Sequence, residues 1–189
     1  MNKPQFYIVT GGPGSGKTTL LNALASKGYQ VVPEVGRAII QREQNLEGDA
    51  VPWKNKQLFY EAMLAQSITD YTNCFSQELV LWDRGIIDSI GYAILENLVI
   101  SPIQRQWAED MKYASHVFIC PPWEEIYTQD KERKQDLALA IKTYEVMKNT
   151  YQRMGYTLVE VPKGTVKERV DFVIEVLKQQ EDERNNRNR

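Results

Sequence analysis

The feature that most constrains the fold is the stretch VTGGPGSGKTTLLNAL at residues 9–24. A short apolar run, FYIV at residues 6–9, leads into this stretch, and a segment of helical character follows it. The pattern G-x-x-x-x-G-K-[ST] is matched by Gly11, Gly16, Lys17 and Thr18. Because the match lies between a strand and a helix, it predicts a phosphate-binding loop rather than an ordinary glycine-rich turn.

The residue types in this loop suit a triphosphate. Glycines let the backbone turn tightly and bring consecutive N–H groups around a phosphate with no Cβ in the way. The helix that begins near Lys17 directs the positive end of its dipole at the same anion. Lys17 is expected to reach the β- and γ-phosphates and the Thr18 hydroxyl to ligate Mg²⁺. The residues predicted to bind ATP with Mg²⁺ are Gly12, Pro13, Gly14, Ser15, Gly16, Lys17, Thr18 and Thr19.

Further short apolar runs alternate with amphipathic segments along the chain. Strands are predicted for QVV (30–32), LVLW (79–82), HVFIC (116–120) and TLVEV (157–161). Most of these runs are apolar without alternation, as in strands that are buried on both faces of a parallel sheet. The sequence therefore predicts an α/β fold with about five parallel strands and helices on both faces. Together with the phosphate-binding loop, this arrangement is expected to be a P-loop NTPase fold of the small nucleoside- and nucleotide-kinase type.

Two helices near the C-terminus have clear boundaries. In residues 134–154, apolar side chains recur at helical spacing, and Gly155 is placed to end that helix. The residues expected on its buried face are Leu137, Ile141, Tyr144, Met147 and Tyr151. Thr165 and Glu168 form a capping-box pattern that predicts the start of a last helix.

The length of 189 residues suits one domain. Residues 1–178 are predicted to form this domain, with a lid-like segment near 121–136, and the polar tail 179–189 is predicted to be disordered. The 23 Lys and Arg nearly balance the 25 Asp and Glu, which favours neither a nucleic-acid surface nor a membrane surface. No signal-peptide pattern or apolar span is present, so a cytoplasmic protein is expected.

Several classes of P-loop protein are excluded by motifs that the chain lacks. The sequence has no N-K-x-D, which guanine-specific switch proteins usually carry, and no SGGQ of the ABC type. The chain is also short for an AAA+ machine with a second subdomain. Small-molecule kinases and minor NTPases remain.

Two charged segments follow predicted strands. Glu34 and Arg37, in PEVGRAII, would share a helical face at the carboxyl end of the second strand, with Glu34 orienting an acceptor hydroxyl and Arg37 holding an anion. Asp83 ends the third strand in LWDRGIID, where P-loop folds place an acid that holds Mg²⁺ or takes a proton. The next residue, Arg84, is a candidate for binding phosphate or substrate. The structural alternatives are a dipole-complementing Glu34 with a salt bridge and an Asp83 that caps a helix. Asp88 is interpreted as no more than a surface or capping group.

A third charged segment, PPWEEIYTQDKERKQDL at residues 121–137, follows the fourth strand. Small kinases hold a lid at this position that closes over the phosphates, and Arg133 is the candidate for neutralising charge on the transferred group. The alternative is a solvated helix start, which is the usual meaning of a run of charges.

In their order and spacing, these segments resemble the AAA_28, or NadR-like, family over roughly residues 5–178. The resemblance rests on the P-loop, PEVGRAII, DRGIID, the lid-like segment and YTLVEVPKGTVKERVDFVIEVL. It implies a compact P-loop kinase fold that uses ATP with Mg²⁺. It also matches Glu34 and Arg37 to the E-x-G-R segment of the family, and Asp83 to its acid after the third strand. Pro33 stands where kinases of the NadR type tend to have an aromatic residue, so the resemblance does not identify the acceptor.

Two functional hypotheses follow. The first is an ATP-dependent kinase for a hydroxyl of a small metabolite, a nucleoside or nucleoside-like compound. Its catalytic residues would be Lys17, Glu34, Asp83 and Arg133, its substrate-binding residues Glu34, Arg37 and Arg84, and its metal ligands Thr18 and Asp83. The sequence does not choose between Glu34 and Asp83 as the base. The second hypothesis is a nucleotide-binding regulatory ATPase or switch that acts on a protein partner.

Overall fold

The structure, a computed structural model, describes residues 5–76, 78–127 and 133–187. Within these residues, strands and helices alternate along the chain. The strands are β1 (Phe6–Gly11), β2 (Gln30–Val32), β3 (Val80–Asp83), β4 (His116–Cys120) and β5 (Thr157–Glu160). The helices are α1 (Lys17–Ala25), α2 (Val35–Asn45), α3 (Lys56–Asn73), α4 (Ile86–Leu95), α5 (Pro102–Asp110), α6 (Glu124–Tyr127), α7 (Arg133–Arg153) and α8 (Val166–Arg187).

The strands form one parallel sheet in the order β2-β3-β1-β4-β5. The α/β fold predicted from the sequence, with about five parallel strands, is confirmed. Strand β1 is central, and its Val9 lies opposite both Asp83 of β3 and Phe118 of β4. Since the strands run in one direction, the loops that follow them gather at the same edge of the sheet. The P-loop that follows β1 therefore lies at the middle of that edge.

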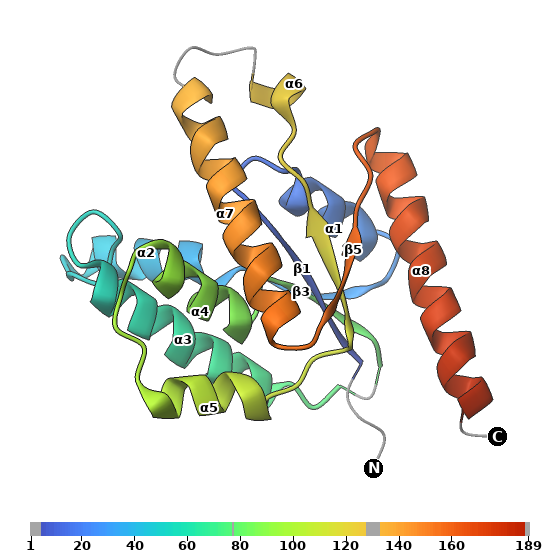
Figure 1. The fold of residues 1–189 in the computed structure, drawn as a ribbon, viewed down its shortest axis with the longest axis horizontal. Helices are drawn as coiled ribbons and strands as arrows, with labels where there is room; N and C mark the ends of the chain where they lie inside the picture. Colours follow the sequence, from blue (N-terminus) through green and yellow to red (C-terminus); the bar gives the residue numbers. More distant parts are fainter. Residues whose placement is uncertain (1–4, 77, 128–132, 188–189) are drawn as a thin grey trace.

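Both faces of the sheet are covered by helices (Figure 1). Successive residues of a strand point to opposite faces. Phe6 and Ile8 join a core that includes Trp82 and residues of α3, α4, α5 and α7. Tyr7 and Val9 join a second core with residues of α1 and α8. All of β1 is buried as a result, which explains why its sequence is apolar without alternation.

The two helix boundaries expected near the C-terminus are present. The Thr165 N–H donates to Glu168 Oε2 at 2.7 Å and the Glu168 N–H donates to Thr165 Oγ1 at 3.2 Å, which is the reciprocal pair of a capping box. Gly155 follows the end of α7 with φ of +83°, a backbone conformation that favours glycine.

The buried face of α7 differs from the expected one at one position. Ile141 is 43% exposed, whereas Ala140 is fully buried. A Cβ built on Gly12 would lie 2.5 Å from the Ala140 carbonyl oxygen. The helix backbone therefore approaches the P-loop closely at Ala140, and this approach turns Ile141 outward.

The polar tail also differs from its prediction. Helix α8 continues to Arg187, so residues 179–187 are helical where the sequence predicts disorder. Val170, Val173 and Leu177 anchor the first part of the helix in the core. Gln, Glu and Arg, which are common in the tail, propagate an established helix at little cost.

The segment expected to act as a lid is described only in part. Helix α6 and the start of α7 lie within it, and residues 128–132 lie outside the described residues. The lid near residues 121–136 therefore stays a prediction. In the part of the chain that the structure describes, every helix is too short or too polar to cross a bilayer.

Candidate active site

The P-loop connects the end of β1 to the start of α1 in very little space. Gly11 has φ of +136°, and a Cβ on it would lie 2.4 Å from the Cys120 carbonyl oxygen. A Cβ on Gly12 would likewise collide with the backbone of Ala140. Gly16, the residue before α1, has φ of +76°. A side chain at Gly11 or Gly12 would collide with backbone, so these glycines are a steric requirement of the loop.

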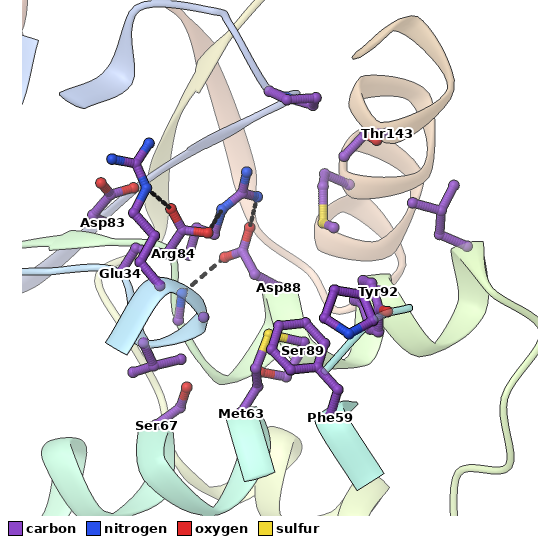
Figure 2. A pocket seen from close by; sticks show the side chains of 18 of the residues that line it. Glu34, Phe59, Met63, Ser67, Asp83, Arg84, Asp88, Ser89, Tyr92 and Thr143 are labelled. Atoms are coloured by element: carbon purple, nitrogen blue, oxygen red, sulfur yellow. Dashed lines mark hydrogen bonds and ion pairs between the residues drawn. The ribbon is translucent and has the colours of Figure 1, made fainter. Parts of the chain in front are cut away.

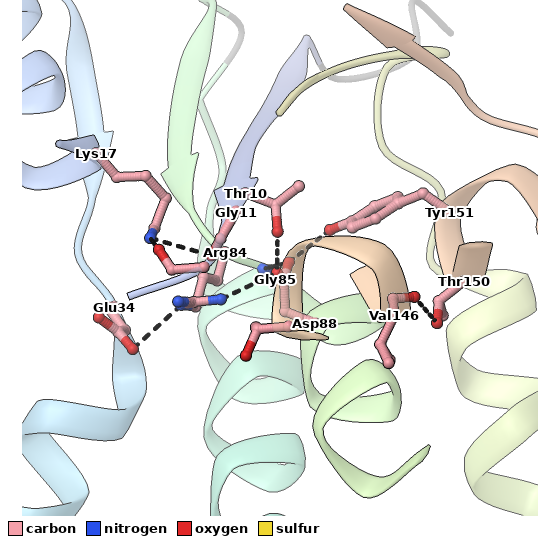
Figure 3. Close-up of polar contacts among 12 residues, drawn as sticks. Thr10, Gly11, Lys17, Glu34, Arg84, Gly85, Asp88, Val146, Thr150 and Tyr151 are labelled. Carbon is pink, nitrogen blue, oxygen red and sulfur yellow. Dashed lines mark hydrogen bonds and ion pairs between the residues drawn. The ribbon is translucent and has the colours of Figure 1, made fainter. Parts of the chain in front are cut away.

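Lys17 lies inside the curl of this loop with its side chain 6% exposed. Its Nζ donates to the carbonyl oxygens of Gly11 at 3.1 Å and Gly12 at 2.8 Å (Figure 3). Burial, together with the nearby Arg84 and against the opposing effect of Asp83, lowers the pKa of Lys17 to about 8. The loop therefore holds a desolvated cation with only neutral oxygens as hydrogen-bond partners. An anion placed there would gain a strong interaction.

The other residues of the loop are partly buried and partly exposed. Ser15 is buried, and its hydroxyl donates to the Gly12 carbonyl oxygen at 2.9 Å. Residues that are exposed at the mouth of the loop are Pro13, Gly14, Thr18 and Thr19. Thr18 is therefore accessible to solvent at the start of α1, and its role as a metal ligand is still a prediction.

Asp83 lies next to the P-loop because its strand pairs with β1. It is buried, and its Oδ1 has no hydrogen-bond partner among the described residues. Burial raises the pKa of Asp83, with a contribution from Glu34, although Lys17 acts in the opposite direction. Helix α4 begins with Gly85 as its N-cap, and Asp88 accepts the hydrogen bond from that N–H. The capping alternative for Asp83 is therefore wrong.

The Arg84 side chain forms ion pairs with Glu34, which follows β2, and with Asp88 of α4, which follows β3. Its Nε lies 3.2 Å from Glu34 Oε1, and its Nη1 lies 3.5 Å from Asp88 Oδ1 (Figure 2). Arg37 Nε lies 3.8 Å from Glu34 Oε2, and the Arg37 side chain is 74% exposed. The expected Glu34–Arg37 face thus exists, but the closer partner of Glu34 is Arg84.

Asp88 is the residue whose place the sequence did not reveal. It is buried, and besides Arg84 it accepts hydrogen bonds from the Thr10 hydroxyl, from the Gly85 N–H at 2.9 Å and from the Tyr151 hydroxyl at 2.5 Å (Figure 3). These donors come from β1, α4 and α7. The Gly85 contact confirms its interpretation as a capping group, but the interpretation as a surface group is wrong, because Asp88 is buried and also connects β1 and α7 to α4. Only its helix-start position was visible as a sequence signal.

Arg133 is the first residue of α7, and its side chain lies outside the described residues. Its predicted role on the transferred group is therefore still a prediction.

A cavity of about 350 Å³ opens beside the P-loop. Pro13 of the P-loop is one of its lining residues. Asp83 and Arg84 lie on one side of it, and Phe59 and Tyr92 lie at a mostly apolar end (Figure 2). The charged residues of its lining are Glu34, Arg37, Asp83, Arg84, Asp88 and Glu96. A volume of this size holds a small organic molecule.

Comparison with known families agrees with this architecture. The model of the AAA_28 family, described as an AAA domain, matches residues 6–169. The chain belongs to the AAA_28 family. No curated protein sequence matches this AAA_28 protein.

Solved structures resemble the AAA_28 protein in fold. A NadR protein, solved in complex with NR, has a TM-score of 0.70 and 19% identity, over 93% of this chain and 51% of that one. Thymidylate kinase from Candida albicans has a TM-score of 0.65 and 15% identity, over 95% and 93% of the two chains. Deoxyadenosine kinase from M. mycoides has a TM-score of 0.56 and 14% identity, over 92% and 98%. The fold is thus that of nucleoside and nucleotide kinases, and the chain spans about half of the NadR protein.

Proposed function

We propose that the protein is an ATP- and Mg²⁺-dependent kinase that phosphorylates a hydroxyl group of a nucleoside-like acceptor. The observation that carries this proposal is the cavity beside the P-loop. A nucleotide switch needs a nucleotide site but no acceptor site, whereas here a second space lies beside the P-loop and is lined by Pro13 and Asp83. Such a space would hold the acceptor next to the phosphoryl group, which is the positioning that phosphoryl transfer requires.

The charges of the cavity favour an acceptor without a phosphate. Its lining has four carboxylates, from Glu34, Asp83, Asp88 and Glu96, against the guanidinium groups of Arg37 and Arg84. Arg84 already faces Glu34 and Asp88, and Arg37 is highly exposed beside Glu34. An acceptor phosphate would therefore find no unpaired cation among these side chains. A neutral or cationic nucleoside-like compound is the better match.

The apolar end of the cavity suits a flat ring. Phe59 and Tyr92 meet edge to face with centroids 5.6 Å apart, and Met63 lies beside them (Figure 2). The Tyr92 hydroxyl is buried and has no hydrogen-bond partner among the described residues. The Ser67 and Ser89 hydroxyls line the same cavity. A ring with polar edge atoms would satisfy these hydroxyls while it covers the apolar surface.

The residues at the P-loop fit Mg·ATP. The glycine-rich loop, the buried Lys17 and the exposed Thr18 suit a triphosphate with its Mg²⁺, and Thr18 is the residue that would supply a protein oxygen to the metal. Among the described residues, no group of three or more His, Cys, Asp or Glu side chains could hold a metal ion alone. Mg²⁺ needs no such group here, because it usually keeps several waters and binds through one or two protein oxygens and the substrate phosphates.

In the proposed reaction, the acceptor hydroxyl oxygen attacks the γ-phosphorus, the bond from that phosphorus to the β-phosphate oxygen breaks, and ADP leaves. The hydroxyl proton passes to a carboxylate. Both oxygens of Glu34 already face guanidinium groups, whereas Asp83 has a free oxygen and a raised pKa caused by burial. We therefore assign proton acceptance to Asp83, and to Glu34 the orientation of the acceptor and of Arg84. Bound Mg²⁺ would neutralise charge on the phosphates.

Substitutions of the two carboxylates separate their roles. Glu34→Gln is expected to leave Mg·ATP binding nearly intact and to lower the transfer rate about tenfold, because it loosens the acceptor and Arg84. Asp83→Asn is expected to lower kcat by about 10²-fold or more. The rate is measured against Mg²⁺ concentration for each variant. An Asp83→Asn defect that excess Mg²⁺ repairs would make Asp83 a metal ligand instead, and a larger loss in Glu34→Gln would make Glu34 the base.

The lowered pKa of Lys17 predicts a proton linkage. At pH 8 the ligand-free protein holds about half a proton on Lys17, and a bound triphosphate restores the full charge by raising its pKa. ATP binding at pH 8 should therefore take up about 0.5 proton, and less at pH 7. In the ligand-free protein, this group lowers stability below pH 8, and the penalty is relieved as pH rises from about 8 toward 10.5. Calorimetry in buffers of different ionisation enthalpy measures the uptake, and pH-independent proton release would contradict it.

The main test of the function follows ATP consumption with a panel of nucleosides, the matching nucleoside monophosphates, and other small alcohols. Strong stimulation by one nucleoside-like compound, with its phosphorylated product identified by mass spectrometry, is the expected result. Stimulation by monophosphates alone would overturn the assignment of a phosphate-free acceptor. A rate of ATP consumption that no small acceptor changes, and that depends on a protein partner, would favour the regulatory ATPase.

A further inference from the structure

Arg169 of α8 lies directly behind the P-loop, far from it in the sequence. Its side chain is buried, with 4% exposure. Nη2 donates to the Ser15 carbonyl oxygen at 3.1 Å and to Cys120 Sγ at 3.1 Å, and Nη1 donates to the Gly16 carbonyl oxygen at 3.4 Å. A Cβ on Gly16 would lie 2.4 Å from Nη1, so the loop and the guanidinium are in close contact.

Among the described residues, this buried cation has no matching anion nearby. Within the described residues, no carboxylate lies within the 4.0 Å of an ion pair with Arg169. Burial raises the pKa of Cys120 against the opposing effect of Arg169, so the thiol stays neutral. The other close group is the Trp123 ring, whose centroid lies 5.9 Å from the guanidinium carbon. A buried charge without an opposite charge is costly unless a ligand supplies one.

The hydrogen bonds to the loop have a geometric consequence. In a trans peptide the C=O and the N–H of one unit point in opposite directions. The Ser15 carbonyl belongs to the same peptide unit as the Gly16 N–H, and the Gly16 carbonyl to the same unit as the Lys17 N–H. The Gly16 carbonyl also accepts the Leu20 N–H of α1 at 3.1 Å, so the helix already fixes that peptide unit. Holding the Ser15 carbonyl toward Arg169 turns the Gly16 N–H away from the guanidinium, toward the side of the loop where a phosphate would bind.

We propose that Arg169 is a positioning residue of the nucleotide site, whose guanidinium orients the Gly16 N–H group and whose charge is balanced by the phosphates of the bound nucleotide. The inference rests on the nucleotide binding in the proposed function. It goes beyond that function because it assigns a role to a helix outside the loop. The two-pronged contact explains why arginine is required, since a lysine would supply one donor group without the planar fork.

The test uses the full-length protein and two readouts, the Kd for a non-hydrolysable ATP analogue with Mg²⁺ and the Tm of the ligand-free protein. Arg169→Met is expected to raise the Kd about 10- to 100-fold, and Arg169→Lys about 3- to 10-fold. Val173→Ala is the matched control, because Val173 is a buried residue one turn further along the same helix, in the core rather than at the loop. It should lower the Tm while leaving the Kd within twofold.

The outcomes are distinct. A raised Kd in both Arg169 variants, with an unchanged Kd in Val173→Ala, supports the positioning role. A Kd within twofold of wild type in Arg169→Lys and Arg169→Met, or a loss that Val173→Ala shares, overturns it. If Arg169→Met does not fold, the Kd of Arg169→Lys still decides. A wild-type protein that does not bind the analogue would overturn the nucleotide site itself, and this inference with it.

Discussion

Lys17→Ala is expected to lower the rate of phosphoryl transfer by about 10³-fold, since one preorganised charge at a reacting oxyanion contributes on this scale. Lys17 is the cation enclosed by the P-loop, with its Nζ held by the carbonyl oxygens of Gly11 and Gly12. Alanine removes the charge that would neutralise the β- and γ-phosphates. The rate of acceptor-dependent ATP consumption under saturating substrates measures the loss.

The stability of Lys17→Ala provides an internal check. Burial of Lys17 lowers its pKa to about 8, so at pH 7 the ligand-free protein carries the cost of a desolvated charge that the unfolded chain does not carry. Removing it should therefore cause no large loss of thermal stability, although activity collapses. The matched control is Lys27→Ala, at an exposed lysine just after α1, which should leave both properties unchanged. A Lys17→Ala protein that keeps activity within tenfold of wild type would exclude the proposed role of Lys17.

Asp88→Ala is expected to lower the free energy of unfolding by about 3–5 kcal/mol. The carboxylate receives hydrogen bonds from Thr10, Gly85 and Tyr151, and it faces Arg84 across 3.5 Å. Alanine leaves these buried donors without an acceptor and Arg84 with one fewer counter-charge. Urea unfolding, analysed for an unchanged m-value, measures the difference.

Two further variants measure how much single partners contribute to the stability that Asp88→Ala loses. Tyr151→Phe removes one donor to Asp88 and should cost about 1 kcal/mol. Glu34→Ala removes the other carboxylate that faces Arg84, but Glu34 is only half-buried, so its cost should also be about 1 kcal/mol or less. If Asp88→Ala is no more harmful than either variant, Asp88 is not the centre of this network.

Local patterns in the sequence were sufficient for most of the fold. The strands were visible as apolar runs, because a strand buried on both faces excludes polar side chains along its length. The P-loop was visible because its glycines meet a steric requirement that other residues cannot meet, as the contacts of Gly11 and Gly12 show. The helical tail was missed, because the core contacts that stabilise α8 belong to residues preceding the tail.

The candidate site was only partly visible for the same reason. Lys17, Glu34 and Arg84 follow strands and Asp83 ends one, and parallel strands bring such positions to one edge of the sheet. The sequence by itself therefore determined the fold class, the phosphate loop and the charged residues near it. Only the tertiary structure decided that Asp88 meets Tyr151 across 63 residues and that Arg169 meets Ser15 across 154. Periodicity and motifs report local geometry, whereas pairs so distant in the chain meet only through the packing of whole helices against the sheet.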